Sequence, residues 1–264
     1  MHAQPRPWML EECTLACARE HRWDTAVIPL GATEPHNLHL PYGTDMFEAE
    51  HLAEACCRRA WELGGKVVQL PVIPYGTETN LAAFPLALNL MPSTITTIFR
   101  DLLKSLEAGG IRKLLLFNSH GGNDFKPMMR ELYGQSSVQL FLCNWYQMIR
   151  DKAAEICENP DDHAGEMETS LIMAYRPELV RKNADGSLVA DDGSVRPFRY
   201  QALTQGWVAM TRPWHLLTTQ SGSGNPHRAT AAKGKQLHDA VVDRIGPFLA
   251  ELAKSPVDER FPFA

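Results

Sequence analysis

Short apolar runs alternate with stretches of helical periodicity through the first half of the chain. The apolar runs are residues 25–31, 66–73, 113–118 and 138–143. The helical periods between them are residues 45–63, 92–107 and 123–133. Because strands that are apolar at every position are typical of sheets buried on both faces, the pattern predicts an α/β fold. Its sheet should be mostly parallel and covered by helices on both sides.

The pattern changes in the last third of the chain. Turn-forming residues are frequent in the segment 181–225. Within it, residues 206–210 predict a short strand that pairs in a hairpin with part of 214–220. One apolar face predicts a final helix over 227–253. No linker separates these parts, so we expect a single domain over 1–264 with an elaborated loop and hairpin region.

Composition places the chain among globular proteins. It has 264 residues, of which 44% are hydrophobic and 22% are charged, and this length can bury a substantial core. The net charge of −5 excludes a basic nucleic-acid-binding surface, and no apolar run reaches the ~18–20 residues that span a membrane. The six cysteines form no C-x-x-C pair and the N-terminus has no secretory signal pattern. We therefore expect free thiols and a cytoplasmic location, with no nucleic-acid or membrane partner.

Candidate metal ligands follow the first predicted strand. Glu34, His36 and Asp45 lie between the end of that strand and the start of the next helix. Ligands bind at this carboxyl edge in open α/β sheets. Carboxylates with imidazoles suit Zn, Mn or Fe, and a carboxylate shared by two ions is usual in two-metal hydrolases. Asp45 is also placed as a helix N-cap, and His39 is more typical of a supporting hydrogen-bonded residue.

Two further segments carry the same residue types. Residues 118–123, with the sequence Asn-Ser-His-Gly-Gly-Asn, follow the third strand and would place His120 at the same edge. A glycine-rich turn into a helix is the alternative explanation for that segment. A later segment holds His163, Glu166 and Glu168, where acidic residues also favour a helix N-terminus. Either glutamate could serve as the acidic ligand.

Other catalytic motifs are absent from the sequence. It contains no G-x-x-x-x-G-K-[ST] phosphate loop, and no G-x-G-x-x-G follows a strand. It also lacks the G-x-S-x-G pattern of a serine nucleophile. The three histidine-containing segments are therefore interpreted together as one metal site.

These motifs resemble those of the creatininase (creatinine amidohydrolase) family. They are Glu34-Pro-His36, Gly43-Thr-Asp45, Asn118-Ser-His120-Gly-Gly-Asn123, His163-Ala-Gly-Glu166-x-Glu168-Thr-Ser170 and Gly224-Asn-Pro226. The resemblance covers about residues 20–250. It implies a three-layer α/β/α sandwich, a dinuclear metal centre and a homo-oligomer, often a hexamer.

The resemblance also implies roles for individual residues. The matching metal ligands are Glu34, His36, Asp45 and His120, with Asp45 as the bridge and Glu168 as the fifth candidate. His163 matches a residue of proton transfer and substrate contact, and Trp145 matches the aromatic wall of the substrate pocket. The implied cofactors are two divalent ions per subunit, Zn and/or Mn, with Fe as a further candidate.

Some positions depart from the family pattern. Members that hydrolyse creatinine carry a tyrosine and a glutamate where this chain has Gly121 and Gly122. The segment 76–90 also differs from the common form, which indicates a changed substrate pocket. We therefore expect Gly121, Glu78 and Trp145 to contact a substrate other than creatinine.

The sequence thus predicts a metal-dependent hydrolase that cleaves a small, polar, cyclic amide with a metal-activated water. The alternative is hydrolytic ring opening at a C–C bond of an oxidised cyclitol or keto-sugar at the same centre, which the changed segment 76–90 motivates. A third interpretation is a non-catalytic metal-binding protein. The presence of His163 disfavours it, because such a protein needs no proton carrier.

Overall fold

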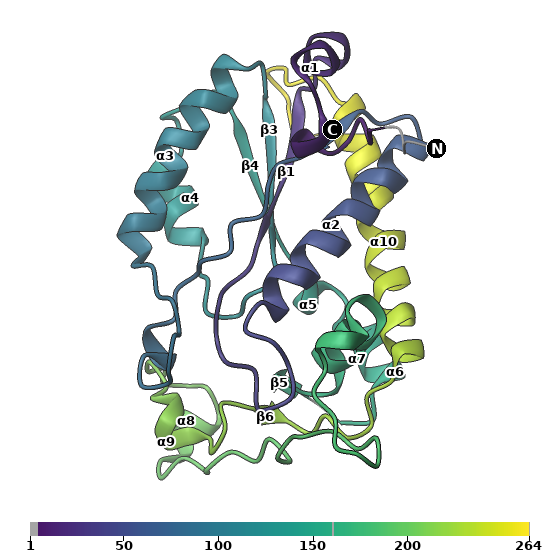
Figure 1. Ribbon diagram of the computed structural model, residues 1–264. Helices are drawn as coiled ribbons and strands as arrows, with labels where there is room; N and C mark the ends of the chain where they lie inside the picture. The colour runs from purple at the N-terminus through teal and green to yellow at the C-terminus, as the bar shows by residue number, and fades with distance from the viewer. Residues whose placement is uncertain (1–4, 160, 264) are drawn as a thin grey trace.

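The central layer of the protein is a parallel sheet of four strands (Figure 1). The computed structural model describes residues 5–159 and 161–263. In spatial order the strands are β2 (Val67–Gln69), β1 (Thr25–Leu30), β3 (Lys113–Asn118) and β4 (Gln139–Asn144). Leu30 lies beside Asn118, which lies beside Asn144, so three strands end level with one another. The segments that follow them therefore start at one edge of the sheet.

Helices cover both faces of this sheet (Figure 1). On one face lie α2 (Thr44–Glu62), α7 (Glu166–Tyr175) and α10 (Ala231–Lys254), and on the other lie α3 (Pro92–Ala108) and α4 (Lys126–Leu132). Val27 of β1 belongs to the core beside α2, whereas Ala26 and Ile28 belong to the core beside α3. Successive strand side chains point to opposite faces, so a continuous apolar run supplies both cores. The expected three-layer α/β/α sandwich is confirmed.

Shorter elements complete the chain. They are the 3₁₀ helices η1 (Leu10–Glu12), η2 (Thr79–Leu81) and η3 (Pro177–Leu179), the helices α1 (Leu15–His21), α5 (Trp145–Met148), α6 (Arg150–Ile156), α8 (Gln201–Thr204) and α9 (Trp214–Leu217), and the strands β5 (Asp161–His163) and β6 (Ser223–Gly224). β5 and β6 pair antiparallel. Together with α8 and α9 they lie at the end of the molecule opposite α1 (Figure 1). No helix among the described residues is long and apolar enough to span a membrane.

The predicted hairpin is wrong. Residues 206–210 form no strand, and the segment expected to pair with them contains helix α9 instead. Trp207 in this segment is 73% exposed. The short strand that follows it in the described chain, β6, pairs with β5 instead. The second predicted strand is also shorter than expected: β2 ends at Gln69, two residues before Pro71. Proline lacks the N–H that a sheet ladder requires.

Candidate metal centre

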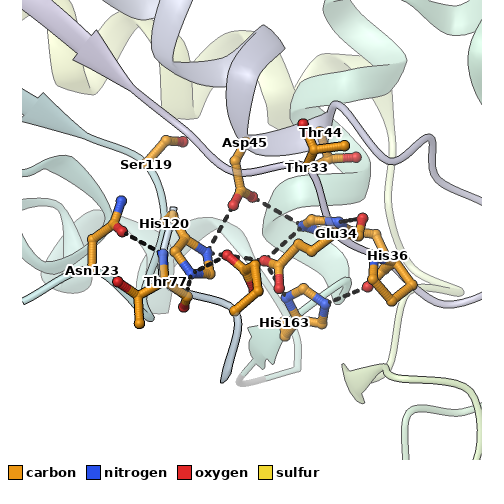
Figure 2. Close-up of polar contacts among 12 residues, drawn as sticks. Thr33, Glu34, His36, Thr44, Asp45, Thr77, Ser119, His120, Asn123 and His163 are labelled. Atoms are coloured by element: carbon orange, nitrogen blue, oxygen red, sulfur yellow. Dashed lines mark hydrogen bonds and ion pairs between the residues drawn. The ribbon is translucent and has the colours of Figure 1, made fainter. Parts of the chain in front are cut away.

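The predicted ligands converge at the carboxyl edge of the sheet (Figure 2). Glu34 and His36 lie in the loop after β1, and Asp45 lies in the first turn of α2. His120 follows β3, and Glu168 lies in the first turn of α7. Glu34 and Asp45 are each 1% exposed and His36 is fully buried, which makes this a charged site inside the protein.

One donor group consists of Glu34, Asp45 and His120. His120 Nδ1 lies 3.0 Å from Glu34 Oε1 and 2.9 Å from Asp45 Oδ2. Two ligands at about 2.1 Å from one ion, 90° apart, are separated by about 3.0 Å. Asp45 Oδ2 and Glu34 Oε2 are buried, and neither accepts a hydrogen bond from any residue that the structure describes. The donor types, their spacing and these unsatisfied oxygens fit a divalent cation.

A second donor group consists of His36, Asp45 and Glu168. His36 Nε2 lies 2.9 Å from Asp45 Oδ1 and 3.8 Å from Glu168 Oε2. Asp45 thus offers one oxygen to each group, which is the geometry a bridging carboxylate needs. Glu34, His36 and His163 form a further group with ligand atoms in reach of one ion, so His163 borders the centre as well.

The charges of the site also favour bound cations. Burial raises the pKa of Glu34 well above its usual range, and the nearby Asp45 and Glu78 raise it further against the opposing effect of His120. Burial opposes protonation of His36, but Asp45 and then Glu168 outweigh it and raise the pKa of His36 to about 10. Without a metal, protonation of Glu34 and His36 therefore reduces the repulsion within this carboxylate cluster. Divalent cations would take over that role.

His163 is held with a defined nitrogen toward the centre. Its Nε2 donates to the carbonyl oxygen of Pro35 at 2.9 Å, so Nδ1 is the unprotonated nitrogen, 3.7 Å from Glu34 Oε1 (Figure 2). The centroid of the ring lies 4.1 Å from that of His36, with the two planes tilted by 37°, and the ring meets Trp214 edge-on at 5.0 Å. Burial and the charge of His36 lower the pKa of His163 well below its usual value. A neutral imidazole with a free Nδ1 can accept a proton.

A cavity of about 100 Å³ opens onto the ligands. Besides Glu34, Asp45, His120, His163 and Glu168, its walls contain Asn80, Leu81, Gly121, Gly122, Arg212 and Trp214. A second cavity of about 500 Å³ is bounded by Gly121 and Glu168 as well. The two cavities therefore adjoin at Gly121 and at the Glu168 side chain.

Two of the three predicted substrate contacts lie elsewhere. Gly121 borders both cavities, as expected for a substrate contact. Trp145 is 1% exposed, packs in the core and donates from Nε1 to Ser119 Oγ at 2.9 Å, so it lines neither cavity. Glu78 is fully buried and lies behind His120, with Oε1 2.7 Å from His120 Nε2. Tertiary packing turns both side chains away from the cavity walls.

The two candidate glutamates of α7 point to different places. Glu168 Oε2 accepts from the backbone N–H of Ala164 at 2.5 Å and belongs to the second donor group. Glu166 pairs with Lys233 at 2.6 Å and accepts from the backbone N–H of Asn159. The geometry therefore favours Glu168 as the ligand, and Glu166 ties α7 to α10.

Some residues of the site carried no signal in the sequence. Trp214 and Arg212 follow the last predicted ligand by more than forty positions and reach the cavity only through the path of the chain. Glu48 lies one helical turn after Asp45, is fully buried, and accepts from Ser119 Oγ at 3.1 Å. Its spacing from Asp45 is also that of an ordinary helix-capping pattern. The sequence therefore did not indicate that this carboxylate is buried close to the ligands.

Two adjoining donor groups that share a carboxylate, at the carboxyl edge of a parallel sheet, define the class of metal-dependent hydrolases. A family model described as creatinine amidohydrolase matches residues 11–249. The chain therefore belongs to the creatininase family and is a hydrolase, as the motifs predicted.

Named relatives of the chain differ in what they hydrolyse. The mycofactocin precursor peptide peptidase of Mycobacterium ulcerans is 27% identical over 245 residues, which cover 89% of this chain and 88% of the peptidase. The 3-dehydro-scyllo-inosose hydrolase of Thermotoga maritima is 31% identical over 174 residues, covering 60% of this chain and 52% of that enzyme. Family membership alone therefore leaves the substrate open.

Solved structures agree with the fold. A candidate creatinine amidohydrolase from Bacteroides fragilis is 34% identical, with a TM-score of 0.86 over 95% of this chain and 98% of its own. A manganese form of creatininase aligns with a TM-score of 0.72 at 20% identity, covering 95% of this chain and 100% of the creatininase chain. At that identity the second comparison supports the fold alone.

Proposed function

We propose that this protein hydrolyses the C–N bond of a polar amide at a centre of two divalent cations. The observation that carries the proposal is the position of Asp45, which directs one oxygen to His120 and the other to His36. Glu34, Asp45 and His120 would hold one cation, and His36, Asp45 and Glu168 would hold the other. When bound, the cations would lower the pKa of a water molecule toward about 7 and stabilise negative charge on the amide oxygen.

The protein itself supplies the proton carrier. His163 Nδ1 is free to accept a proton from the attacking water, because Nε2 is committed to the Pro35 carbonyl. The same nitrogen can then deliver the proton to the departing amine nitrogen. Packing against His36 and Trp214 restrains the plane of the ring, so the proton moves along one direction. Burial of the ring keeps it neutral and ready to act as a base.

The two cavities restrict the substrate. The cavity of about 100 Å³ at the proposed ligands is the smaller of the two, so it would take the reacting group of the substrate. The remainder of the substrate would extend past Gly121 into the cavity of about 500 Å³. A cyclic amide is the first candidate, and the peptidase relative supports a peptide amide as the second. The inosose hydrolase relative supports a cyclic ketone cleaved at a C–C bond as the third.

The test combines metal removal with a substrate panel. The purified chain is stripped with a chelator, reconstituted with Zn²⁺ or Mn²⁺, and assayed with cyclic amides, short peptides and keto-cyclitols. Turnover should disappear on stripping and return with metal. His120→Ala should abolish it, and the control His21→Ala on α1, at the other end of the molecule, should leave it unchanged. Full turnover by the metal-free protein would refute the proposal, and turnover of keto-cyclitols alone would replace amide hydrolysis by ring opening.

A further inference from the structure

We infer that Glu78 is a positioning residue that holds His120 in the tautomer required for metal binding. Glu78 is fully buried, and its Oε1 lies 2.7 Å from His120 Nε2. Neither carboxylate oxygen accepts a hydrogen bond in the described part of the chain, so His120 Nε2 is a donor within reach of an otherwise unsatisfied carboxylate. The inference rests on the metal centre of the proposed function, and it assigns to Glu78 a role that acts through His120.

The two nitrogens of His120 face different surroundings. Nδ1 faces the carboxylates of Glu34 and Asp45, which belong to the donor group. Nε2 faces Glu78 Oε1 and the carbonyl oxygen of Thr77, which lies 3.3 Å away. Both nitrogens thus face acceptors, and a cation on Nδ1 would leave the hydrogen on Nε2, where Glu78 and the Thr77 carbonyl can accept it. A carboxylate on the outer nitrogen fixes the ring orientation and makes the ligating nitrogen more basic.

The backbone around His120 leaves room for this contact. A Cβ at Gly122 would lie 2.2 Å from His120 Nε2 and 2.6 Å from the Thr77 oxygen. A Cβ at Gly76 would lie 3.1 Å from His120 Cδ2. A side chain at Gly122 would therefore displace the ring from Glu78. This packing explains the glycine at position 122, whereas a Cβ at Gly121 would meet no atom within 4 Å.

Asparagine side chains hold the backbone of the loop at Glu78 and at Thr77 before it. The backbone N–H of Glu78 donates to Asn89 Oδ1 at 2.7 Å, and the N–H of Thr77 donates to Asn123 Oδ1 at 3.1 Å (Figure 2). Asn123 also donates from Nδ2 to Asn118 Oδ1, so the loop is joined to the segment of His120 itself. Hydrogen bonds through asparagine side chains therefore hold the backbone of Glu78 in place relative to the segment of His120.

A buried carboxylate needs a paired cationic or donor group to be stable. For Glu78 the described residues supply His120 Nε2 at this distance, and Glu34 and Asp45 add negative charge on the far side of the same ring. A cation on Nδ1 would polarise the N–H toward Glu78 and so strengthen the contact. Metal binding and the Glu78–His120 contact should therefore stabilise each other.

The test measures metal affinity without any substrate. Zn²⁺ and Mn²⁺ dissociation constants of the full chain are determined by competition with a chelating dye, for wild type, Glu78→Ala and Glu78→Gln. Glu78→Ala should weaken binding about 10- to 100-fold. Glu78→Gln keeps an acceptor oxygen and should show a smaller loss. Glu166→Gln is the matched control, because Glu166 is also fully buried but pairs with Lys233 rather than with a proposed ligand.

A second readout follows the tautomer directly. In ¹⁵N-histidine-labelled, Zn²⁺-loaded protein, His120 should show protonated Nε2 in wild type and a mixed or altered signal in Glu78→Ala. Equal affinities of wild type and both Glu78 variants would overturn the inference, and so would a Glu166→Gln loss as large as that of Glu78→Gln. If Glu78→Ala does not fold, the near-isosteric Glu78→Gln decides. A wild-type chain that binds no divalent cation would instead refute the proposed function.

Discussion

Alanine at position 234 is expected to push α10 away from α7. A Cβ at Gly234 would lie 2.0 Å from the carbonyl oxygen of Ser170 and 2.5 Å from its carbonyl carbon. These are backbone atoms of α7, so no side-chain rotation can relieve the overlap. An ordinary contact needs about 3.5 Å, so the helices must separate locally by about 1.5 Å.

The cost follows from overpacking and helix propensity. Forcing extra atoms into a packed interior costs about 1–3 kcal/mol, and rigid backbone on both sides places this case near the upper value. Alanine recovers about 1 kcal/mol because it favours the helix over glycine. The net loss is about 2 kcal/mol, which lowers Tm by roughly 4–8 °C in a chain of this size.

Calorimetry of Gly234→Ala and of Gly109→Ala tests this estimate. Gly109 is right-handed at φ −77°, and a Cβ there would meet its nearest atoms at 3.4 Å, so alanine should be tolerated. Because α7 carries Glu168, Gly234→Ala should also weaken Zn²⁺ binding, whereas Gly109→Ala should not. A melting temperature of Gly234→Ala that matches Gly109→Ala would refute the packing argument.

The remaining predictions concern the ligand choice and the response to acid. Glu168→Gln should reduce Zn²⁺ affinity, whereas Glu166→Gln should reduce thermal stability by breaking the Lys233 pair; equal metal affinities would contradict the assignment. Burial and the charge of His36 lower the pKa of His39 from 6.5 to about 4. Between these values the unfolded chain binds a proton that the folded chain excludes, so the free energy of unfolding should fall as the pH falls from 6.5 toward 4. Urea denaturation at about pH 7 and about pH 4.5 should show a smaller fall in His39→Gln than in wild type, and equal falls would refute this reasoning.

The layers of the fold could be predicted because each depends on local pattern. The strand predicted at 113–118 has these bounds in the structure, and the helix predicted at 45–63 begins and ends within one residue of α2. Strands that are apolar on both faces occur mainly in parallel sheets that lie between two layers of helices. The strand prediction for the segment 206–210 was wrong because a strand needs a pairing partner, and no strand of the described residues pairs with this segment.

The site could be predicted only as a set of residue types at one edge of the sheet. Parallel strands that end level bring their following loops together, which is why Glu34 and His120 could be grouped before their distance was known. Trp145 also follows a strand at this edge, yet its side chain turns into the core. Position along the chain places a residue at an edge, but packing decides which way its side chain points.

The sequence by itself determined the strand and helix pattern, the three ligand-bearing segments and the membership in a metal-hydrolase family. Only the tertiary structure decided that Glu168 faces His36 while Glu166 faces Lys233. It also placed Glu78 beside His120 Nε2. That contact depends on a hydrogen bond between Thr77 and Asn123, which lie far apart in the sequence. Local patterns are set by short-range backbone and burial preferences. The partners of a buried charge depend on segments far apart in the sequence, which meet only when the core has formed.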